Sequence, residues 1–359
     1  MTPAEKVVAM TPEEVREQVR AGGLLPADDP VSTRLIVAML SGGRDSVCLL
    51  DLAVSLCGAP SVRALHVNYG LRPEADGDER HCRELCERLG VALEVVRARA
   101  AGDPAPPGNL QAWARELRYR AAADLARQYE GSIATGRAAT GQVETIPIAT
   151  GHTATDQVET VLYRLAAAPG RRALLGMAPR EGRLVRPLLE LTREQTAAYC
   201  RARGLTGRED SSTDDERYAR ARVRNRLVPA LDTVHPAARE NVLRTAQLLR
   251  EEAEVLDALV EAELERDCAT LGGGLHGYGG GPSVAIERLQ DLPPALARLV
   301  VVRLAEQVAG TYVPQAGARV REILALARRG GRAELHVGGL VGAVIEDGRL
   351  RMVKLPPRS

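Results

Sequence analysis

The feature that most constrains the fold is the stretch Ser41-Gly42-Gly43-Arg44-Asp45-Ser46, which lies between two apolar runs. The run 35–40 before it predicts a buried parallel strand, and the run 47–56 after it predicts a helix. Glycines at such a turn let the backbone approach a ligand, and the N–H groups and dipole of the next helix favour an anion. We therefore expect a phosphate-binding loop, in which Ser41 and Ser46 add hydroxyl donors and Asp45 holds Mg²⁺.

The composition limits the class of protein. The chain has 359 residues, of which 45% are hydrophobic, so it has room for two domains with sizeable cores. It contains no apolar run of membrane-spanning length, and residues 1–20 lack the apolar core of a signal peptide, so we expect no membrane association and a cytoplasmic location. The six cysteines form no CxxC pair, which argues against a metal site or a disulfide framework.

The first half of the chain alternates between strand and helix patterns. Strands are predicted at 35–40, 62–67, 93–98 and 146–150, and helices at 45–57, 76–89, 110–129 and 156–165. Strand starts spaced by roughly 30 residues are typical of βαβ units, so we expect a doubly wound, mostly parallel α/β sheet. Ligands bind beyond the carboxyl ends of such strands. The stretch 41–46, the pair His66 and Asn68, and Gly151-His152 all fall at these ends.

The rest of the chain predicts further parts. We expect an N-terminal helical extension (1–24), the α/β domain (25–231), a helical domain (232–312) and a small C-terminal α/β segment (313–359). One segment is a tandem duplication, because residues 133–145 are echoed by 148–160 with ten of thirteen positions identical. Only the second copy carries His152 and Asp156, so we expect the first to be an inserted surface loop.

Five stretches, in order, resemble the tRNA(Ile)-lysidine synthetase family of the N-type ATP pyrophosphatases, over about residues 35 to 231. They are the loop 41–46, His66 to Arg72, Asn109 to Tyr119, Thr150-Gly151-His152 with Asp156 to Thr160, and Arg186 to Leu189 with Glu209 to Ser212 and Arg220 to Pro229. The resemblance implies a Rossmann-like PP-loop fold. It also implies an enzyme that uses ATP and Mg²⁺ to adenylylate the wobble cytidine of tRNA(Ile) and then attaches L-lysine to ring carbon 2.

The resemblance also implies site residues. The nucleotide is expected at Ser41, Gly42, Gly43, Arg44, Asp45, Ser46, His66, Asn68, Gly151 and His152, with Asp45 as the metal ligand. Arg115 and Arg118 lie three apart on one helical face and match family arginines, so they are assigned to the triphosphate or the adenylylated base. Asp156 and Glu159 begin a helix, where two carboxylates form a cradle for the lysine ammonium or simply compensate the helix dipole.

Arginines dominate the segment 171–226 near the end of the α/β domain, and this segment is expected to contact tRNA. The helical domain that follows it, 232–312, is expected to bind substrate and tRNA. We assign Arg171, Arg172, Arg220, Arg222 and Arg224 to the RNA backbone. The alternative is a charged surface balanced by the acids at 214–216. A homodimer is one assembly to test.

The chain departs from the family pattern at several positions, which leaves rival functions open. Tyr69, Thr153, Thr155, Thr213 and Ala221 stand where the family usually has His, His, Asp, Asn and Asn, and 167–170 lacks a family arginine that Arg171 or Arg172 replaces. The rivals are a cytidine thiolase, whose relatives carry CxxC pairs, an amide-forming pyrophosphatase, and an RNA- or nucleotide-binding protein that has lost catalysis.

Overall fold

The computed structural model of the protein describes residues 10–26, 35–71, 73–98, 109–136, 145–167, 170–208, 216–269 and 281–356. The chain forms two compact units, Met1–Gln247 and Leu248–Ser359, whereas we expected boundaries near residues 24, 231 and 312. Of the motif residues, Arg72 and the stretch 209–212 lie outside the described residues, as do residues 137–144 in the duplicated segment. Among the described residues, no helix is both long and apolar enough to cross a bilayer.

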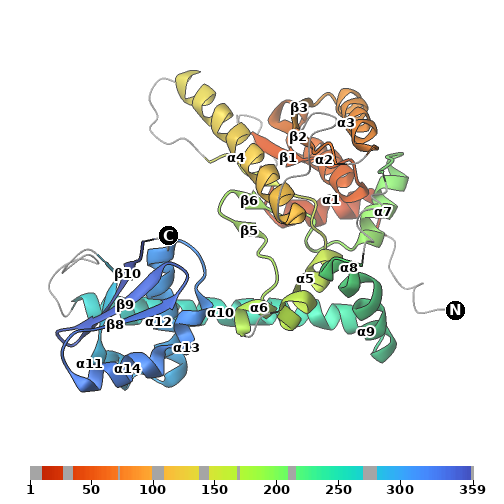
Figure 1. Ribbon diagram of the computed structural model, residues 1–359. Helices are drawn as coiled ribbons and strands as arrows, with labels where there is room; N and C mark the ends of the chain where they lie inside the picture. The colour runs from red at the N-terminus through yellow and green to blue at the C-terminus, as the bar shows by residue number, and fades with distance from the viewer. Residues whose placement is uncertain are drawn as a thin grey trace. The chain divides into compact units, whose positions relative to one another are not determined.

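The first unit is an α/β fold (Figure 1). Its strands are β1 (Ile36–Met39), β2 (Val62–Asn68), β3 (Ala92–Arg97), β4 (Ile148–Ala149), β5 (Arg180–Glu181) and β6 (Leu184–Val185). Its helices are α1 (Pro12–Ala21), α2 (Arg44–Cys57), α3 (Ala75–Leu89), α4 (Leu110–Gly136), α5 (Ala154–Ala167), α6 (Arg171–Leu174), α7 (Arg193–Ala202), α8 (Ala219–Arg222), a π-helical turn (Val223–Leu227) and α9 (Val228–Val234). Helix α10 (Ala238–Ala269) contains the division between the two units.

The strands of the first unit make one six-stranded sheet in the order β3-β2-β1-β4-β6-β5. All neighbours are parallel except β5, which pairs antiparallel with β6. The central strand β1 is buried along its whole length, which explains why its sequence is a continuous apolar run rather than an alternating one. The mostly parallel, doubly wound sheet is therefore confirmed.

Helices cover both faces of this sheet. Residues of α1, α2, α3 and α7 share one apolar core with Ile36, Ala38 and Leu40 of the β1 segment, and Cys82 and Cys86 of α3 are buried in it as free thiols. Residues of α4 pack on the opposite face against Val37 and Met39. Alternate residues of β1 thus point to opposite cores, and the carboxyl end of the strand carries the glycine-rich loop between them.

The second unit has one core of its own. It contains α11 (Ile286–Asp291), α12 (Pro294–Ala309), α13 (Pro314–Ala318), α14 (Val320–Arg329) and the strands β7 (Ser283–Ala285), β8 (Ala333–Gly338), β9 (Val341–Glu346) and β10 (Arg349–Lys354). The strands form an antiparallel sheet in the order β7-β10-β9-β8, and the helices share a single apolar cluster with it. Residues 313–359 contain both helices and strands, as expected for the C-terminal α/β segment. The short strand β7 joins these strands from sequence that we had assigned to a helical region.

The duplicated segment differs from expectation at its start. Residues 133–136, which begin the first copy, form the last turn of α4 rather than part of a surface loop. The helix runs through Gly131 without a break, and its last turn includes Gly136.

Candidate active site

The glycine-rich loop is organised by its own serines. The Ser46 hydroxyl donates to Gly43 O at 2.7 Å, and Ser41 Oγ donates to Ser46 Oγ at 3.1 Å. Gly42 has a positive φ of 87°, which favours glycine, and Gly43 is the N-cap of α2 with no side-chain hydrogen bond to the first turn. The serines, which we expected to donate to phosphate, thus shape the loop, and the uncapped start of α2 presents its N–H groups.

Two further glycines hold other segments close to this loop. A Cβ on Gly151, which follows β4, would lie 3.0 Å from the carbonyl carbon and oxygen of Asp45. A Cβ on Gly207 would lie 2.5 Å from both N and Cα of Arg44. Next to it, Arg208 donates its backbone N–H to Gly42 O at 2.9 Å and pairs through Nε with Asp78 Oδ1 at 2.5 Å. The chain after α7 therefore supports the loop from outside the sheet.

The carboxylate of Asp45 faces α7 across the loop. Its Oδ1 accepts the Thr196 hydroxyl at 2.5 Å, and its Oδ2 lies 3.6 Å from Arg193 Nε. Arg44 Nε lies 3.7 Å from Oδ1. Burial raises the pKa of Asp45, and the Thr196 hydrogen bond works against this rise.

Asp156 and Glu159 lie on α5 and face the same guanidinium. Asp156 Oδ2 caps the start of α5 by accepting the Thr153 N–H at 2.8 Å and the Thr153 hydroxyl at 2.9 Å, while its Oδ1 accepts from Arg193 Nη2 at 2.8 Å. Burial acts to raise the pKa of Asp156, but Arg193 and the Thr153 N–H outweigh it and the pKa lies below its usual value. Glu159 is buried and binds Arg224 in bidentate fashion, at 2.7 and 2.9 Å, with Arg193 Nη1 at 3.6 Å.

His66 and Asn68 close the carboxyl end of β2. His66 Nδ1 lies 2.9 Å from Leu40 O, so this nitrogen carries the proton, and its Nε2 is buried with no hydrogen-bond partner among the described residues. Burial lowers the pKa of His66. The Asn68 amide donates to Asp76 and Glu79 on α3, at 3.0 and 3.1 Å, so it anchors the strand to the helix.

Cationic side chains gather near His152. Burial lowers the pKa of His152 to about 4, and the charges of Arg186, Arg118 and Arg115 act in the same direction. Its Nδ1 lies 2.8 Å from Thr150 Oγ1. The two α4 arginines also stack against Tyr119, with Arg115 Cζ 4.8 Å and Arg118 Cζ 5.7 Å from the ring centre.

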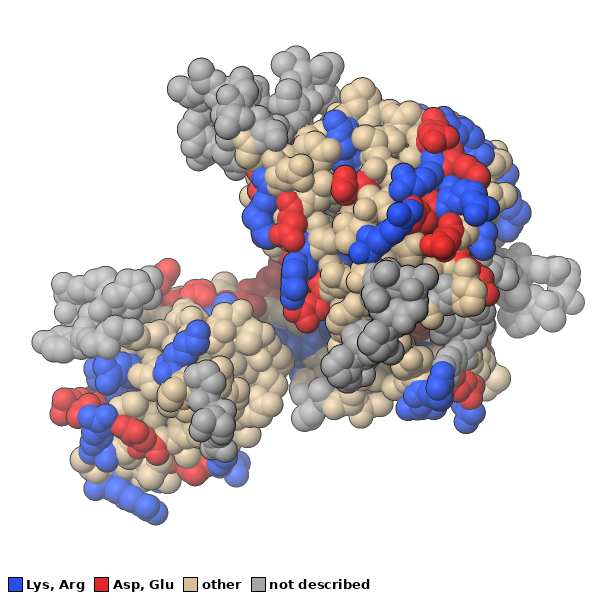
Figure 2. Space-filling model, turned by 45° about the horizontal axis from the view of Figure 1, so that its top comes forward, with Lys and Arg blue, Asp and Glu red and all other residues tan. Residues whose placement is uncertain are grey.

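The arginines assigned to RNA do not share one environment. Arg220 and Arg222 are exposed, and Arg222 Nη1 donates to Glu216 O at 2.8 Å and to Arg217 O at 3.0 Å. Arg171 and Arg172 are half-buried on α6. Arg224 instead points inward to Glu159, as described above. In Figure 2, basic and acidic side chains lie side by side on the visible face, so the positive side chains on that face do not form one continuous patch.

Sequence reasoning found the loop and the acids but missed what joins them. Asp45, Asp156 and Glu159 are brought together around Arg193, which we had not singled out; nor had we singled out Thr196. The stretch Thr192-Arg193-Glu194-Gln195 forms a capping box at the start of α7, with Thr192 N donating to Gln195 Oε1 at 2.8 Å. That signal was readable and would have placed Arg193 at a helix start. Gly207 and Arg208 left no signal of this kind.

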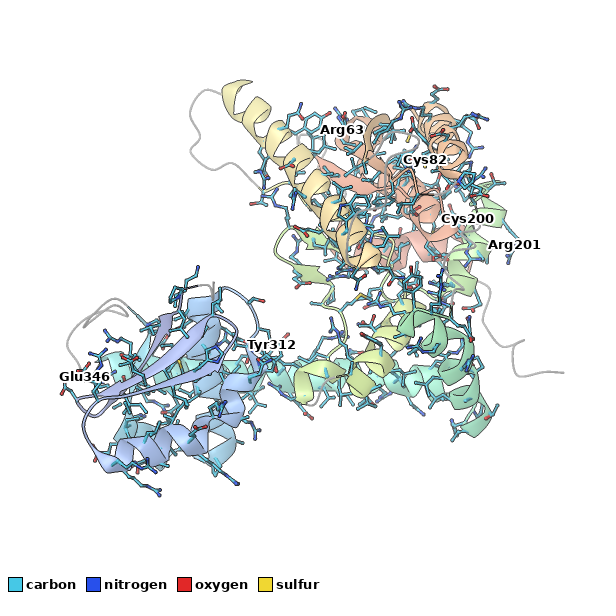
Figure 3. All side chains as sticks on the ribbon, in the orientation of Figure 1. Arg63, Cys82, Cys200, Arg201, Tyr312 and Glu346 are labelled. Carbon is cyan, nitrogen blue, oxygen red and sulfur yellow. The ribbon has the colours of Figure 1, made fainter. Side chains whose placement is uncertain are left out.

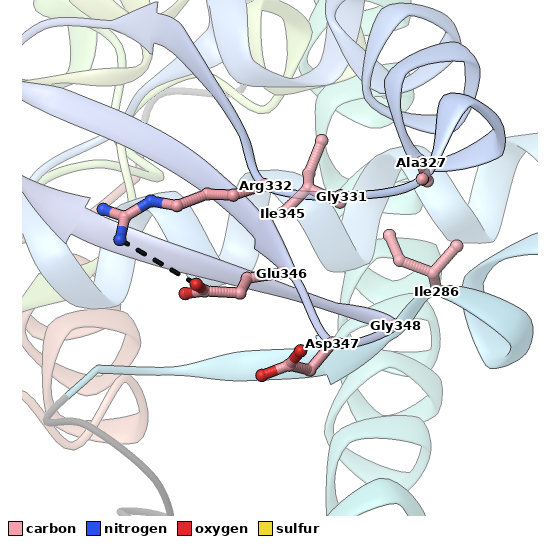
Figure 4. A pocket seen from close by; sticks show the side chains of 9 residues that line it. Ile286, Ala327, Gly331, Arg332, Ile345, Glu346, Asp347 and Gly348 are labelled. Atoms are coloured by element: carbon pink, nitrogen blue, oxygen red, sulfur yellow. Dashed lines mark ion pairs between the residues drawn. The ribbon is translucent and has the colours of Figure 1, made fainter.

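A separate cavity lies in the second unit. It has a volume of about 280 Å³ and is lined by Ile286, Ala327, Gly330, Gly331, Arg332, Ile345, Glu346, Asp347 and Gly348 (Figure 4). Arg332 pairs with Glu334 at 2.8 Å and lies 3.8 Å from Glu346, so its charge is already balanced. No residue predicted for the site lines this cavity. Among the described residues, no group of three or more His, Cys, Asp or Glu side chains is placed to hold a metal ion.

Comparison with known proteins identifies the family of the chain. Residues 16–231 match the PP-loop domain family. A tRNA(Ile)-lysidine synthase of Pseudomonas syringae pv. tomato is 35% identical over 238 residues, which are 64% of this chain and 49% of that protein. The tRNA(Ile)-lysidine synthase of Symbiobacterium thermophilum is 36% identical over 364 residues, covering 96% of this chain and 70% of that protein.

The chain spans about half the length of several of these curated relatives. Among solved structures, a U34-tRNA thiolase of Methanococcus maripaludis with a [4Fe-4S] cluster is similar with a TM-score of 0.51 and 16% identity, covering 66% of this chain and 78% of that one. That likeness supports the fold alone. With a family match over more than half of its residues and a relative matched along nearly all of them, the chain belongs to the PP-loop family and, within it, to the tRNA(Ile)-lysidine synthases.

Proposed function

We propose that the protein is an enzyme that joins L-lysine to carbon 2 of the wobble cytidine of an isoleucine tRNA with a CAU anticodon. In the first step the cytidine O2 attacks the α-phosphorus of ATP, and the bond to pyrophosphate breaks. In the second step the ε-amine of lysine attacks carbon 2, AMP leaves, and the amine loses a proton. The observation that carries the proposal is the convergence of a phosphate loop and two carboxylates of α5 on a single side chain, Arg193.

The loop suits a nucleoside triphosphate. The uncapped start of α2 presents N–H groups to a ligand. Because Gly42 and Gly151 have no side chains, the space beside the loop is not filled. Asp45 is the carboxylate that fits Mg²⁺, since it stands in the first turn of α2 and its Oδ2 lies 3.6 Å from Arg193 Nε, which is longer than a hydrogen bond. When bound there, Mg²⁺ offsets negative charge on the phosphates. Arg115 and Arg118 are proposed to stabilise the departing pyrophosphate or the adenylylated base.

The carboxylates suit a primary amine. Asp156 stays charged because its pKa lies below the usual value, so it attracts an ammonium group. Glu159 is buried beside it, and its charge is held in place by Arg224. We propose that Arg224 orients the amine site through Glu159, which changes its expected role from RNA contact to positioning. Arg220 and Arg222, with Arg171 and Arg172, remain the proposed contacts to the tRNA backbone.

The first test is pyrophosphate exchange into ATP. With an unmodified isoleucine tRNA transcript and Mg²⁺, the protein should exchange labelled pyrophosphate without lysine, and should incorporate labelled lysine into the tRNA when lysine is added. Pyrophosphate exchange at the same rate with and without the tRNA would refute the assignment of cytidine as the attacking group. Binding of tRNA and ATP without exchange would identify a protein that has lost catalysis.

Glu159→Gln separates the two half-reactions. It keeps the shape of the side chain and removes the negative charge, so lysine use should fall more than pyrophosphate exchange. Equal losses in both reactions would show that Glu159 serves the fold around Arg224 rather than the amine. Glu116→Gln on α4 is a matched control, because Glu116 is exposed and pairs with Arg120 on the same helix at 2.5 Å.

A further inference from the structure

Arg193 closes the carboxylate site in this structure. Each of its guanidinium nitrogens faces a different acid: Nε lies 3.6 Å from Asp45, Nη2 lies 2.8 Å from Asp156, and Nη1 lies 3.6 Å from Glu159. The side chain of Arg193 is 24% exposed, compared with 19% for Asp45, 17% for Asp156 and 5% for Glu159, so solvent reaches Arg193 and two of the acids. Its backbone N–H donates to Thr155 Oγ1 at 3.2 Å, which ties the start of α7 to α5.

The remaining oxygens of the α5 acids already have donors. Asp156 Oδ2 takes two hydrogen bonds from Thr153, and both oxygens of Glu159 are taken by Arg224. An ammonium group brings three donors and a positive charge. It would therefore compete with Arg193 for the same acceptors and be repelled by its charge.

The same helix links this closure to the nucleotide loop. Thr196 lies one turn after Arg193 on α7 and donates to Asp45 Oδ1 at 2.5 Å. A divalent cation held by Asp45 would compete for the carboxylate that now faces both Thr196 and Arg193, and its charge would repel the guanidinium. Loading the loop thus weakens one of the three contacts that keep Arg193 over the acids.

We propose that Arg193 is a positioning residue. Its guanidinium occupies the amine site in the ligand-free protein and moves away from Asp156 and Glu159 when Mg²⁺ and nucleotide bind at Asp45. The inference rests on the proposed function, because it takes a primary amine as the ligand of Asp156 and Glu159. It predicts an order of binding, with nucleotide before lysine. It also predicts reciprocity, since lysine must then tighten nucleotide binding by the same factor.

The test is equilibrium dialysis of labelled L-lysine against the full chain, with and without the Mg²⁺ complex of α,β-methylene-ATP, in the presence and absence of an unmodified isoleucine tRNA transcript. For wild type we expect nucleotide to tighten lysine binding at least about fivefold, the lower end of ordinary coupling between sites. In Arg193→Gln, lysine should bind without nucleotide about as tightly as it binds wild type with nucleotide. The coupling should disappear. Arg201→Gln is the matched control, because Arg201 is an exposed arginine on the same helix (Figure 3) and should keep wild-type coupling.

The outcomes separate this inference from the proposed function. Lysine binding by wild type that is unaffected by nucleotide overturns the inference and leaves the function standing. Weaker lysine binding by Arg193→Gln than by wild type without nucleotide also overturns it, because Arg193 would then help to hold the amine. Absence of lysine binding in every wild-type condition refutes the lysine assignment itself. If Arg193→Gln does not fold, the wild-type measurement and its reciprocal, nucleotide binding with and without lysine, still decide the matter.

Discussion

Gly207→Ala is the sharpest test of how the nucleotide loop is supported. Gly207 is remote in sequence from the loop, yet a Cβ there would lie 2.5 Å from N and Cα of Arg44 and 2.9 Å from its Cβ. That is about 1 Å short of the separation of ~3.5 Å at which carbon atoms make their best contact. The φ angle of Gly207 is not in the left-handed region, so the expected cost is steric alone.

The strain cannot be relieved by a flexible side chain, because the atoms in the way are backbone. Either the start of α2 or the segment at 207–208 must move, and the second is held by the hydrogen bond from Arg208 N to Gly42 O and by the ion pair with Asp78. Overpacking of this kind costs roughly 1–3 kcal/mol of unfolding free energy. For a unit of this size, each kcal/mol lowers Tm by roughly 2–4 °C.

The effect on activity should exceed the effect on stability. A displacement of about 1 Å at a reacting group lowers the rate by roughly 100-fold. We expect that order of loss in kcat/KM for ATP, measured by tRNA-dependent pyrophosphate exchange, in a protein that remains folded by thermal unfolding. Gly131→Ala in α4 is the control, since nothing lies within 4 Å of its added Cβ and the change should be neutral or slightly stabilising. If Gly207→Ala keeps exchange within about threefold of wild type, the loop does not depend on this contact.

Three other predictions test the remaining assignments. Asp45→Ala should abolish adenylylation while leaving thermal unfolding unchanged within a few degrees, and exchange with Mg²⁺ near the wild-type rate would exclude Asp45 as the metal ligand. Replacing Arg220 and Arg222 with Ala should weaken tRNA binding and reduce the log–log salt slope by roughly 0.7–0.9 for each lost phosphate contact. Arg226→Ala is the control, because the Arg226 guanidinium is paired with Glu216, and an unchanged slope in the double variant would place Arg220 and Arg222 outside the RNA interface. The His152 ring should remain neutral down to a pKa of about 4, so its NMR titration should show no midpoint near the ordinary 6.5; because the unfolded chain binds that proton first, stability should be complete above pH 6.5 and decline as the pH falls toward 4.

Much of the first unit was predictable because its signals are local. The buried run of β1, the spacing of β1, β2 and β3, and the helix after the glycine-rich loop each follow from a few adjacent residues. The hairpin of β5 and β6 was missed because each strand has only two residues, too few to show a period. The ends of the longer elements agreed within a few residues except for α4, which extends to Gly136.

The candidate site was predictable as a set of residues but not as a set of contacts. Helical spacing placed Asp156 and Glu159 on one turn, and this part is local. Their partners are not: Arg193 comes from α7 and Arg224 from the π-helical turn, 37 and 65 positions further along the chain from the acids that they bind. The spacing of Asp156 and Glu159 predicts an acidic pair that can bind a ligand. It gives no information about the two arginines, distant in the sequence, that contact these acids in the structure.

The duplicated segment shows the same limit within a single tetrapeptide. Ile-Ala-Thr-Gly occurs at 133–136, where it ends α4, and at 148–151, where it supplies β4 and the turn that approaches the nucleotide loop. Identical residues have identical propensities, so the difference is tertiary. The second copy lies between β1 and β6, with Ile148 N donating to Arg183 O at 2.7 Å and Thr150 N to Val185 O at 3.0 Å. Gly151 can approach Asp45 only because these strands hold it there, so the second copy owes its place in the site to the sheet around it rather than to its own sequence.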